Sequence, residues 1–148
     1  MRYLILIILS AAALLTACSP SDTSHEPPPP GEPAADLGDF YSFYQSFHLD
    51  SAYQMDHILF PLEGLPANAD SATIANGDFR WQAEDWKLHR PVDYETSDYR
   101  RELIPISKDI VVEKIIHRNG QTGMMRRFAR LGDEWYLIYF ADLNRIKK

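Results

Sequence analysis

The chain has 148 residues and a formal net charge of −6, and this length fits a single folded domain. The acidic balance argues against a nucleic-acid partner, because phosphate binding relies on clustered lysine and arginine. The single cysteine, Cys18, has no partner within the chain, so an intramolecular disulfide is excluded and the core alone has to hold the domain together.

The first 17 residues have the features of a bacterial signal segment. Arg2 provides a positive charge, and the apolar run over residues 3–15 is shorter than the roughly 18 residues that a membrane-spanning helix needs. Residues 15–18, LTAC, then follow the lipobox pattern. This resembles a bacterial lipoprotein signal peptide, which implies cleavage before Cys18, a thioether-linked diacylglycerol on its sulfur, and acyl chains such as palmitate that give a stable membrane anchor. The alternative is an ordinary secretory signal with an incidental cysteine.

Residues 18–35 are expected to connect the lipid on Cys18 to the domain. They contain no large apolar side chain after Cys18 and many prolines, so they cannot bury enough surface to fold. Pro27–Pro30 should form a polyproline II spacer, with a site for a proline-binding module as the alternative. Ser19 follows the cysteine, and in enteric-type bacteria this would resemble sorting to the outer membrane. The predicted organisation is a signal peptide (1–17), a lipidated tether (18–35) and an α+β domain (36–148) at the bacterial cell envelope.

The domain is predicted to begin with an aromatic helix over residues 36–50. Large apolar side chains recur there at helical spacing, which indicates a wide face packed against a sheet. Asp50 is then expected to cap a short second helix over residues 51–55. The next residues, 58–60, are expected to form a short strand that Pro61 stops. The side chains that define the first helix are Leu37, Phe40, Tyr41, Phe43, Tyr44 and Phe47.

The middle of the chain has weaker patterns. Residues 63–76 contain Gly64, Pro66 and Asn68 and end at Asn76-Gly77, which predicts a loop or weak hairpin, with Ile74 in a brief strand. Phe79 and Trp81 are expected to alternate out of a following strand. Residues 83–86 could form a turn of helix or a bulge, and residues 93–101 show no readable pattern.

Three strands are predicted at the end of the chain, over residues 110–117, 123–131 and 135–141. Turn sequences separate them, so they should form a three-stranded antiparallel meander. The last strand is apolar on both faces, with Trp135, Leu137 and Tyr139 on one and Tyr136, Ile138 and Phe140 on the other. Its second face should therefore be covered by a partner subunit, by a bend that closes a pocket, or by a ligand. A homodimer through the last strands is one of these possibilities.

The order of elements predicts an α+β class. The run VVEKIIHRNGQTGMMRRFARLGDEWYLIYF resembles the closing hairpins of the nuclear transport factor 2-like superfamily. The stretches FYSFYQSFHLDSAYQMDHILFPL and DWKLHR are similar to a family of uncharacterised bacterial envelope lipoproteins assigned to that type of fold. The resemblance implies a cystatin-like cone, with an N-terminal aromatic helix packed on a curved antiparallel sheet that ends in the meander. It also implies a pocket at the wide end and provides no catalytic residue.

A ligand-binding site is predicted from aromatic and basic residues. Trp81, Trp86, His89 and Arg90 lie close together in sequence and are candidate binding residues. The aromatic residues that could line a pocket for a glycan or another flat ligand are Trp81, Trp86, Tyr94, Tyr99 and Trp135. Arg126 belongs to a basic cluster on the meander, and guanidinium groups bind anionic groups in bidentate fashion. The alternative for the aromatic residues is core packing. For Arg126 it is cross-strand pairing with Glu113, Asp133 or Glu134.

Catalysis has less support than binding. The chain has no nucleophile elbow, phosphate-binding loop or dinucleotide fingerprint, its five histidines lack metal-site spacing, and no cofactor or metal is predicted. A pocket pair, Asp56 with His57 or Asp85 with His89, leaves a hydrolase or isomerase as an alternative. The sequence favours a non-catalytic module, anchored to a membrane through Cys18, that binds an unidentified small ligand or protein.

Overall fold

The structure is a computed structural model that describes residues 37–146. The predicted signal segment and the tether, with Cys18, lie outside these residues. Within the described range, no helix is both long enough and apolar enough to cross a lipid bilayer.

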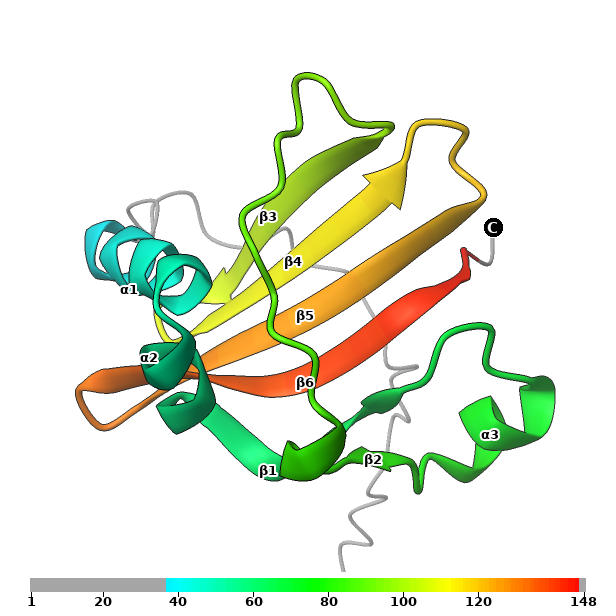
Figure 1. Ribbon diagram of the computed structural model, residues 1–148, viewed down its shortest axis with the longest axis horizontal. Coiled ribbons are helices and arrows are strands. Elements are labelled where there is room, and N and C mark those ends of the chain that lie inside the picture. The colour runs from blue at the N-terminus through cyan, green and yellow to red at the C-terminus, as the bar shows by residue number, and fades with distance from the viewer. Residues whose placement is uncertain (1–36, 147–148) are drawn as a thin grey trace, which may run out of the picture. The chain divides into compact units, whose positions relative to one another are not determined.

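The described residues form one α+β unit built on a single sheet (Figure 1). The six strands follow the order β2-β1-β6-β5-β4-β3, and only the β1–β6 pair is parallel. The predicted class is therefore confirmed: an N-terminal helix lies on one face of a curved sheet that ends in a meander. The elements are α1 (Gly38–Leu49), α2 (Ser51–Asp56), β1 (Ile58–Leu65), α3 (Ser71–Asn76), β2 (Arg80–Trp81), the 3-10 turn η1 (Ala83–Asp85), β3 (Tyr99–Ser107), β4 (Ile110–His117), β5 (Thr122–Leu131) and β6 (Glu134–Arg145).

The core lies between α1 and one face of the sheet, which we call the inner face. Phe40, Phe43 and Phe47 of α1 are buried, and their rings lie 5.5, 5.7 and 5.7 Å from the ring of Phe128 on β5. The aromatic helix predicted over residues 36–50 is thus confirmed, with its apolar face used for packing. Asp50 caps α2 as predicted, since its Oδ1 accepts hydrogen bonds from the backbone N–H groups of Ala52 and Tyr53 at 2.9 and 3.1 Å.

The prediction that Pro61 ends the first strand is wrong. β1 continues to Leu65, and its pairing with β6 is irregular between Ile58 and Glu63. Proline has no backbone N–H, so it fits inside a strand where the hydrogen-bond ladder is already interrupted. The proline therefore lies within this irregularity, and pairing resumes after it.

The brief strand predicted at Ile74 is also wrong, because Ile74 belongs to α3. The Asp70 side chain accepts a hydrogen bond from the Thr73 backbone N–H at 2.8 Å, and Gly77 ends the helix with a φ of 64°. These capping residues decide the local structure more strongly than one β-branched side chain does. Of the two possibilities for residues 83–86, a turn of helix or a bulge, the structure has the helical turn, η1.

The predicted meander is confirmed, and it has one strand more than the sequence indicated. β3 pairs with β4 through eight residue pairs and lies at the edge of the sheet. Its alternating pattern is obscured because several of its side chains are exposed. β3 begins at Tyr99, in the stretch that showed no readable pattern.

β6 bends, which corrects the predicted assignment of its two faces. Phe128 pairs with Leu137 but Arg127 pairs with Tyr139, so Ile138 is an extra residue in β6. The alternation reverses at this bulge, and Phe140 joins Leu137 on the inner face. The bend is one of the three explanations expected for the doubly apolar strand. The homodimer through the last strands stays a prediction.

A long connection crosses the inner face between η1 and β3 (Figure 1), and we call residues 86–98 the strap. Gln54 of α2 fixes one part of it by bonding both backbone groups of His89. Arg118, in the turn after β4, fixes the other part by donating to the backbone carbonyls of Tyr94 and Ser97 at 3.0 and 3.1 Å. The strap separates two cavities of the inner face.

Candidate ligand-binding pocket

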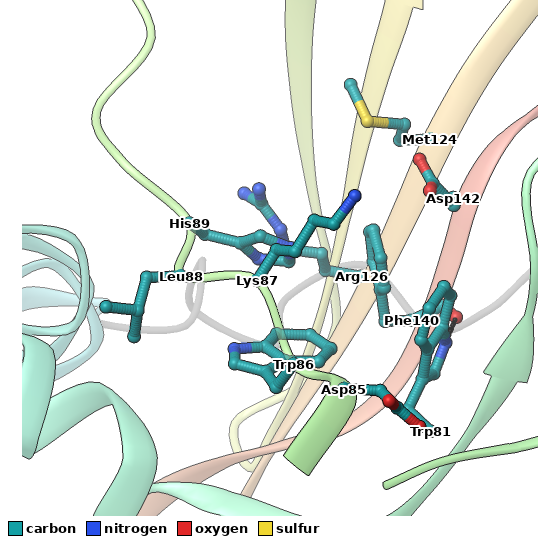
Figure 2. A pocket seen from close by; sticks show the side chains of 10 residues that line it. All are labelled: Trp81, Asp85, Trp86, Lys87, Leu88, His89, Met124, Arg126, Phe140 and Asp142. Carbon is teal, nitrogen blue, oxygen red and sulfur yellow. Dashed lines mark hydrogen bonds between the residues drawn. The ribbon is translucent and has the colours of Figure 1, made fainter. Parts of the chain in front are cut away.

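The first cavity, which we call the tryptophan pocket, has a volume of about 260 Å³ (Figure 2). It lies between the inner face of β5 and β6 and the chain from β2 to the start of the strap. One wall is aromatic: the Trp86 ring lies 6.2 Å from Trp81 and 5.5 Å from Phe140, and His89 lies 4.6 Å from Phe140. The lining residues are Trp81, Asp85, Trp86, Lys87, Leu88, His89, Met124, Arg126, Phe140 and Asp142.

Trp81 is fixed against β6. Its Nε1–H donates to the backbone carbonyl of Phe140 at 2.9 Å, and the two rings lie 5.4 Å apart. Gly64 of β1 permits this approach: a Cβ at that position would lie 1.9 Å from the Phe140 carbonyl oxygen and 2.7 Å from Trp81 Nε1. The indole is therefore held by a backbone contact that only glycine allows at this point.

Gln54 orients Trp86 and His89, and sequence reasoning missed it. The side chain is 1 % exposed, and its Oε1 accepts from the His89 backbone N–H at 2.7 Å and from Trp86 Nε1–H at 3.3 Å. Its Nε2 donates to the backbone carbonyls of His89 and Phe47 at 2.8 and 2.6 Å. One buried amide thus joins α1, α2 and the strap, and no local signal marks a glutamine for such a role.

An ion pair lies at the base of the pocket. Arg126 of β5 and Glu113 of β4 are opposite each other on the inner face, and an Arg126 terminal nitrogen donates to Glu113 Oε2 at 2.8 Å. Their side chains are 5 % and 0 % exposed. The Tyr44 hydroxyl donates to Glu113 Oε1 at 2.5 Å, so both carboxylate oxygens are used. The charge of Arg126 is therefore already balanced.

His48 of α1 extends this network as a neutral acceptor. The same Arg126 nitrogen lies 3.2 Å from His48 Nε2, and His48 Nδ1 lies 2.8 Å from the Tyr44 carbonyl oxygen. Because arginine only donates, Nε2 accepts and Nδ1–H donates to the carbonyl. Burial, followed by the charge of Arg126, lowers the pKa of His48, which fits the neutral form.

Two buried polar atoms have no hydrogen-bond partner among residues 37–146: Nε of Arg126 and Nδ1 of His89. Burial, with the positive charge of Arg126 and the nearby His48 as further causes, lowers the pKa of His89 to about 2. The His89 imidazole is therefore neutral at physiological pH. Unpaired buried polar groups are costly, so a water molecule or a ligand group is expected to satisfy them.

The structure brings four of the five predicted binding residues together. Trp81, Trp86, His89 and Arg126 all line the tryptophan pocket, whereas Arg90 is exposed on the strap and does not line it. The expected cross-strand pairing of Arg126 with Glu113 is also present. Of the other six lining residues, Asp85 was expected only as a catalytic partner of His89, and the remaining five were not predicted.

The predicted Asp–His pairs do not form hydrogen-bonded pairs. Asp56 is exposed, while His57 is buried with its ring stacked 3.8 Å from Tyr53. Asp85 and His89 both line the pocket, but no hydrogen bond joins them, and in Figure 2 the Asp85 carboxylate lies beside Trp81. Across residues 37–146, no three His, Cys, Asp or Glu side chains are placed to hold a metal ion.

Comparisons with known proteins add similarities of fold. No family model matches the chain, and a search of curated proteins gives no match. The chain is similar to the solved structure of a cystatin-like protein from Bacteroides caccae, with 20 % identity and a TM-score of 0.49 over 69 % of this chain and 74 % of that one. A nuclear transport factor 2-like protein from Bacteroides fragilis has 15 % identity and a TM-score of 0.46 over 70 % of this chain and 46 % of that one.

A cystatin-like fold protein from Burkholderia xenovorans is a third similar structure, with 13 % identity and a TM-score of 0.37 over 77 % of this chain and 91 % of that one. At these identities and TM-scores, the likeness assigns neither a ligand nor an activity to this chain.

Proposed function

We propose that the protein is a lipid-anchored lipoprotein of the bacterial cell envelope whose domain binds a small neutral ring-shaped ligand, such as a pyranose sugar, without transforming it. The observation that carries the proposal is the tryptophan pocket, where an aromatic wall faces polar groups with no excess of positive charge. Aromatic rings with a few placed polar groups are typical of small-molecule sites.

The charges of the pocket disfavour an anionic ligand. At the base, Arg126 is paired with Glu113. The remaining charged lining residues are Lys87, Asp85 and Asp142, so the lining has no excess of positive charge that would attract an anion. Carboxylates and a neutral imidazole are suitable partners for hydroxyl or amide groups. The indole rings of Trp81 and Trp86 then provide apolar surface for one face of a ring.

Binding is favoured over catalysis by the state of His89. A general base works best when its pKa lies near the working pH, and the pKa of His89 is lowered to about 2. It also lacks a hydrogen bond from its Nδ1 to a carboxylate that would orient it. An Asp85–His89 hydrolase or isomerase is therefore the weaker proposal.

The ligand is tested by tryptophan fluorescence titration of residues 18–148 carrying Cys18→Ser. We expect N-acetylglucosamine or another neutral pyranose to bind more tightly than glucuronate or glucose 6-phosphate. Trp86→Leu should weaken binding about tenfold or more, since it removes the indole face on which the ligand ring would stack. Asp85→Ala tests the polar wall without loss of packing, because Asp85 is exposed.

The matched control is Arg90→Gln, an exposed neighbour outside the lining, which should leave binding unchanged. Stronger binding of the anionic sugars, or equal binding by wild type and both pocket variants, would contradict the neutral-ligand proposal.

The anchor is tested separately by metabolic labelling with an alkyne palmitate in a bacterial host. The wild-type chain should incorporate the label and fractionate with membranes, and Cys18→Ser should lose both properties. Cys18 is the single cysteine of the chain, so thiol labelling at another site cannot explain the signal. Secretion of an unlabelled wild-type chain would favour an ordinary signal peptide instead.

A further inference from the structure

A second cavity lies on the other side of the strap, between the strap and α1. Its volume is about 430 Å³, and we call it the arginine cavity. Tyr44, Gln45, His48 and Leu49 come from the last turns of α1, Pro91, Val92 and Tyr94 from the strap, and Arg101 from β3. None of these residues lines the tryptophan pocket.

Arg101 is the charged residue of this lining, and it has no acidic partner. No ion pair or direct hydrogen bond to a carboxylate joins it to any Asp or Glu of residues 37–146. Its guanidinium carbon lies 5.3 Å from the ring centres of both Tyr44 and Tyr94, so the group is held between two aromatic side chains. The Tyr44 side chain is also a hydrogen-bond partner of the guanidinium. These contacts do not neutralise the charge, and the remaining N–H groups can bind an anion.

Nearby charges do not cancel Arg101, although the carboxylate of Glu113 attracts it without direct contact. The carboxylate beneath the cavity, Glu113, already pairs with Arg126 and accepts from the Tyr44 hydroxyl. His48 is neutral, since its Nε2 accepts from Arg126. The cavity is therefore locally positive on a chain whose formal net charge is −6.

The rest of the cavity is apolar and open at its mouth. Leu49 is 62 % exposed and Val92 is 37 % exposed, and Pro91 lies beside them in the lining. A single cation next to exposed apolar side chains matches a ligand with one negative charge and an apolar body. A phosphate group carries close to two negative charges at neutral pH. It is a poorer match, because Arg101 is the single cation of the lining and would leave the second negative charge unbalanced.

We propose that the arginine cavity binds a small monocarboxylate with an apolar body, such as an aromatic or medium-chain carboxylic acid. The carboxylate pairs with the guanidinium of Arg101, and the body packs on Leu49, Pro91 and Val92. This site is independent of the sugar-binding role proposed for the tryptophan pocket.

The test is an NMR or calorimetric titration of residues 18–148 carrying Cys18→Ser, with benzoate and octanoate as probes and benzamide and octanol as their neutral counterparts. The carboxylates should bind at least about tenfold more tightly than the neutral probes, since charge-assisted hydrogen bonds are the stronger ones. Arg101→Gln should remove this preference. Trp86→Leu should leave it unchanged, which separates the two sites.

The matched control is Arg100→Gln. Arg100 precedes Arg101 on β3, forms its ion pair with Glu102 and does not line the arginine cavity, so its loss should not change benzoate binding. Val92→Asp provides a second variant at an exposed position and should weaken carboxylate binding through repulsion. The proposal is overturned if benzamide binds as well as benzoate, if neither carboxylate binds at millimolar concentration, or if Arg100→Gln has the effect expected of Arg101→Gln.

Discussion

Arg126→Met should lower the free energy of unfolding by about 3 to 5 kcal/mol, because it leaves the buried carboxylate of Glu113 without its cation. Glu113 is 0 % exposed, so water cannot replace the lost partner. The substitution also removes the hydrogen bond that the Arg126 guanidinium donates to His48 Nε2. Urea unfolding at neutral pH measures the change directly.

The double variant Arg126→Met with Glu113→Leu should be more stable than Arg126→Met alone. Replacing both partners of a buried ion pair with apolar residues leaves no unpaired charge, and such replacements are often neutral or stabilising. The Tyr44 hydroxyl would still lose its acceptor, so full recovery is not expected. The comparison separates the cost of an orphaned charge from the contribution of the pair itself.

Arg127→Met is the matched control. Arg127 follows Arg126 on β5 but is exposed on the other face of the sheet, over the ring of Tyr139 at 5.3 Å. Its loss should cost at most about 1 kcal/mol. Two results would contradict this prediction. One is that Arg126→Met lowers the free energy of unfolding no more than Arg127→Met does, and the other is that the double variant is as unstable as Arg126→Met alone. Either would mean that the buried Glu113 carboxylate does not need Arg126 as its partner.

The partner of Glu113 could be predicted from the sequence, but its burial could not. VVEKII is a strand with two charged residues, Glu113 and Lys114, between apolar ones. Glu113 was one of three acidic residues expected to pair with the basic cluster, and it is the partner of Arg126. Glu113 is completely buried because α1 covers the inner face of the sheet. The residue pattern along a single strand does not show that a helix covers it. Local pattern predicted the strand, while the tertiary packing of Tyr44 and His48 determined the environment.

Elements that are stabilised by local interactions were predictable. The helix with its repeated phenylalanines, the Asp50 cap and the glycine-containing turns of the meander all have local physical causes. β3 and the position of the bulge in β6 were not predicted, because an exposed edge strand loses its alternating pattern and a bulge reverses it. A bend was one of the three explanations offered for the two apolar faces of β6.

The tryptophan pocket was predictable in part for the same reason. Trp81, Trp86 and His89 lie within nine positions, so their proximity in sequence suggested a shared site. Gln54 lies 35 residues away from His89 and has an ordinary helical context, yet it sets the position of both Trp86 and His89. Long-range contacts of a buried amide have no sequence signal in a single chain.

Acid should destabilise the protein through His89, whose pKa in the folded state is lowered to about 2 by burial and by the nearby Arg126 and His48. An unfolded histidine takes up a proton near pH 6.5, and the folded one remains neutral far below that. The unfolded state therefore binds more protons, and stability falls as the pH drops below about 6.5, by about 1.4 kcal/mol per pH unit. His48 acts in the same direction, because its pKa is also lowered.

His89→Phe isolates this contribution while keeping an aromatic ring against Trp86 and Phe140. Between pH 7 and pH 5, the wild type should lose about 2 kcal/mol more of its unfolding free energy than the variant does. Above about pH 7.5 the two stability curves should run parallel, because histidine is then neutral in both states. Parallel curves between pH 7 and 5 would instead mean that folded His89 accepts a proton, and His89 would then be available as the base that the catalytic alternative requires.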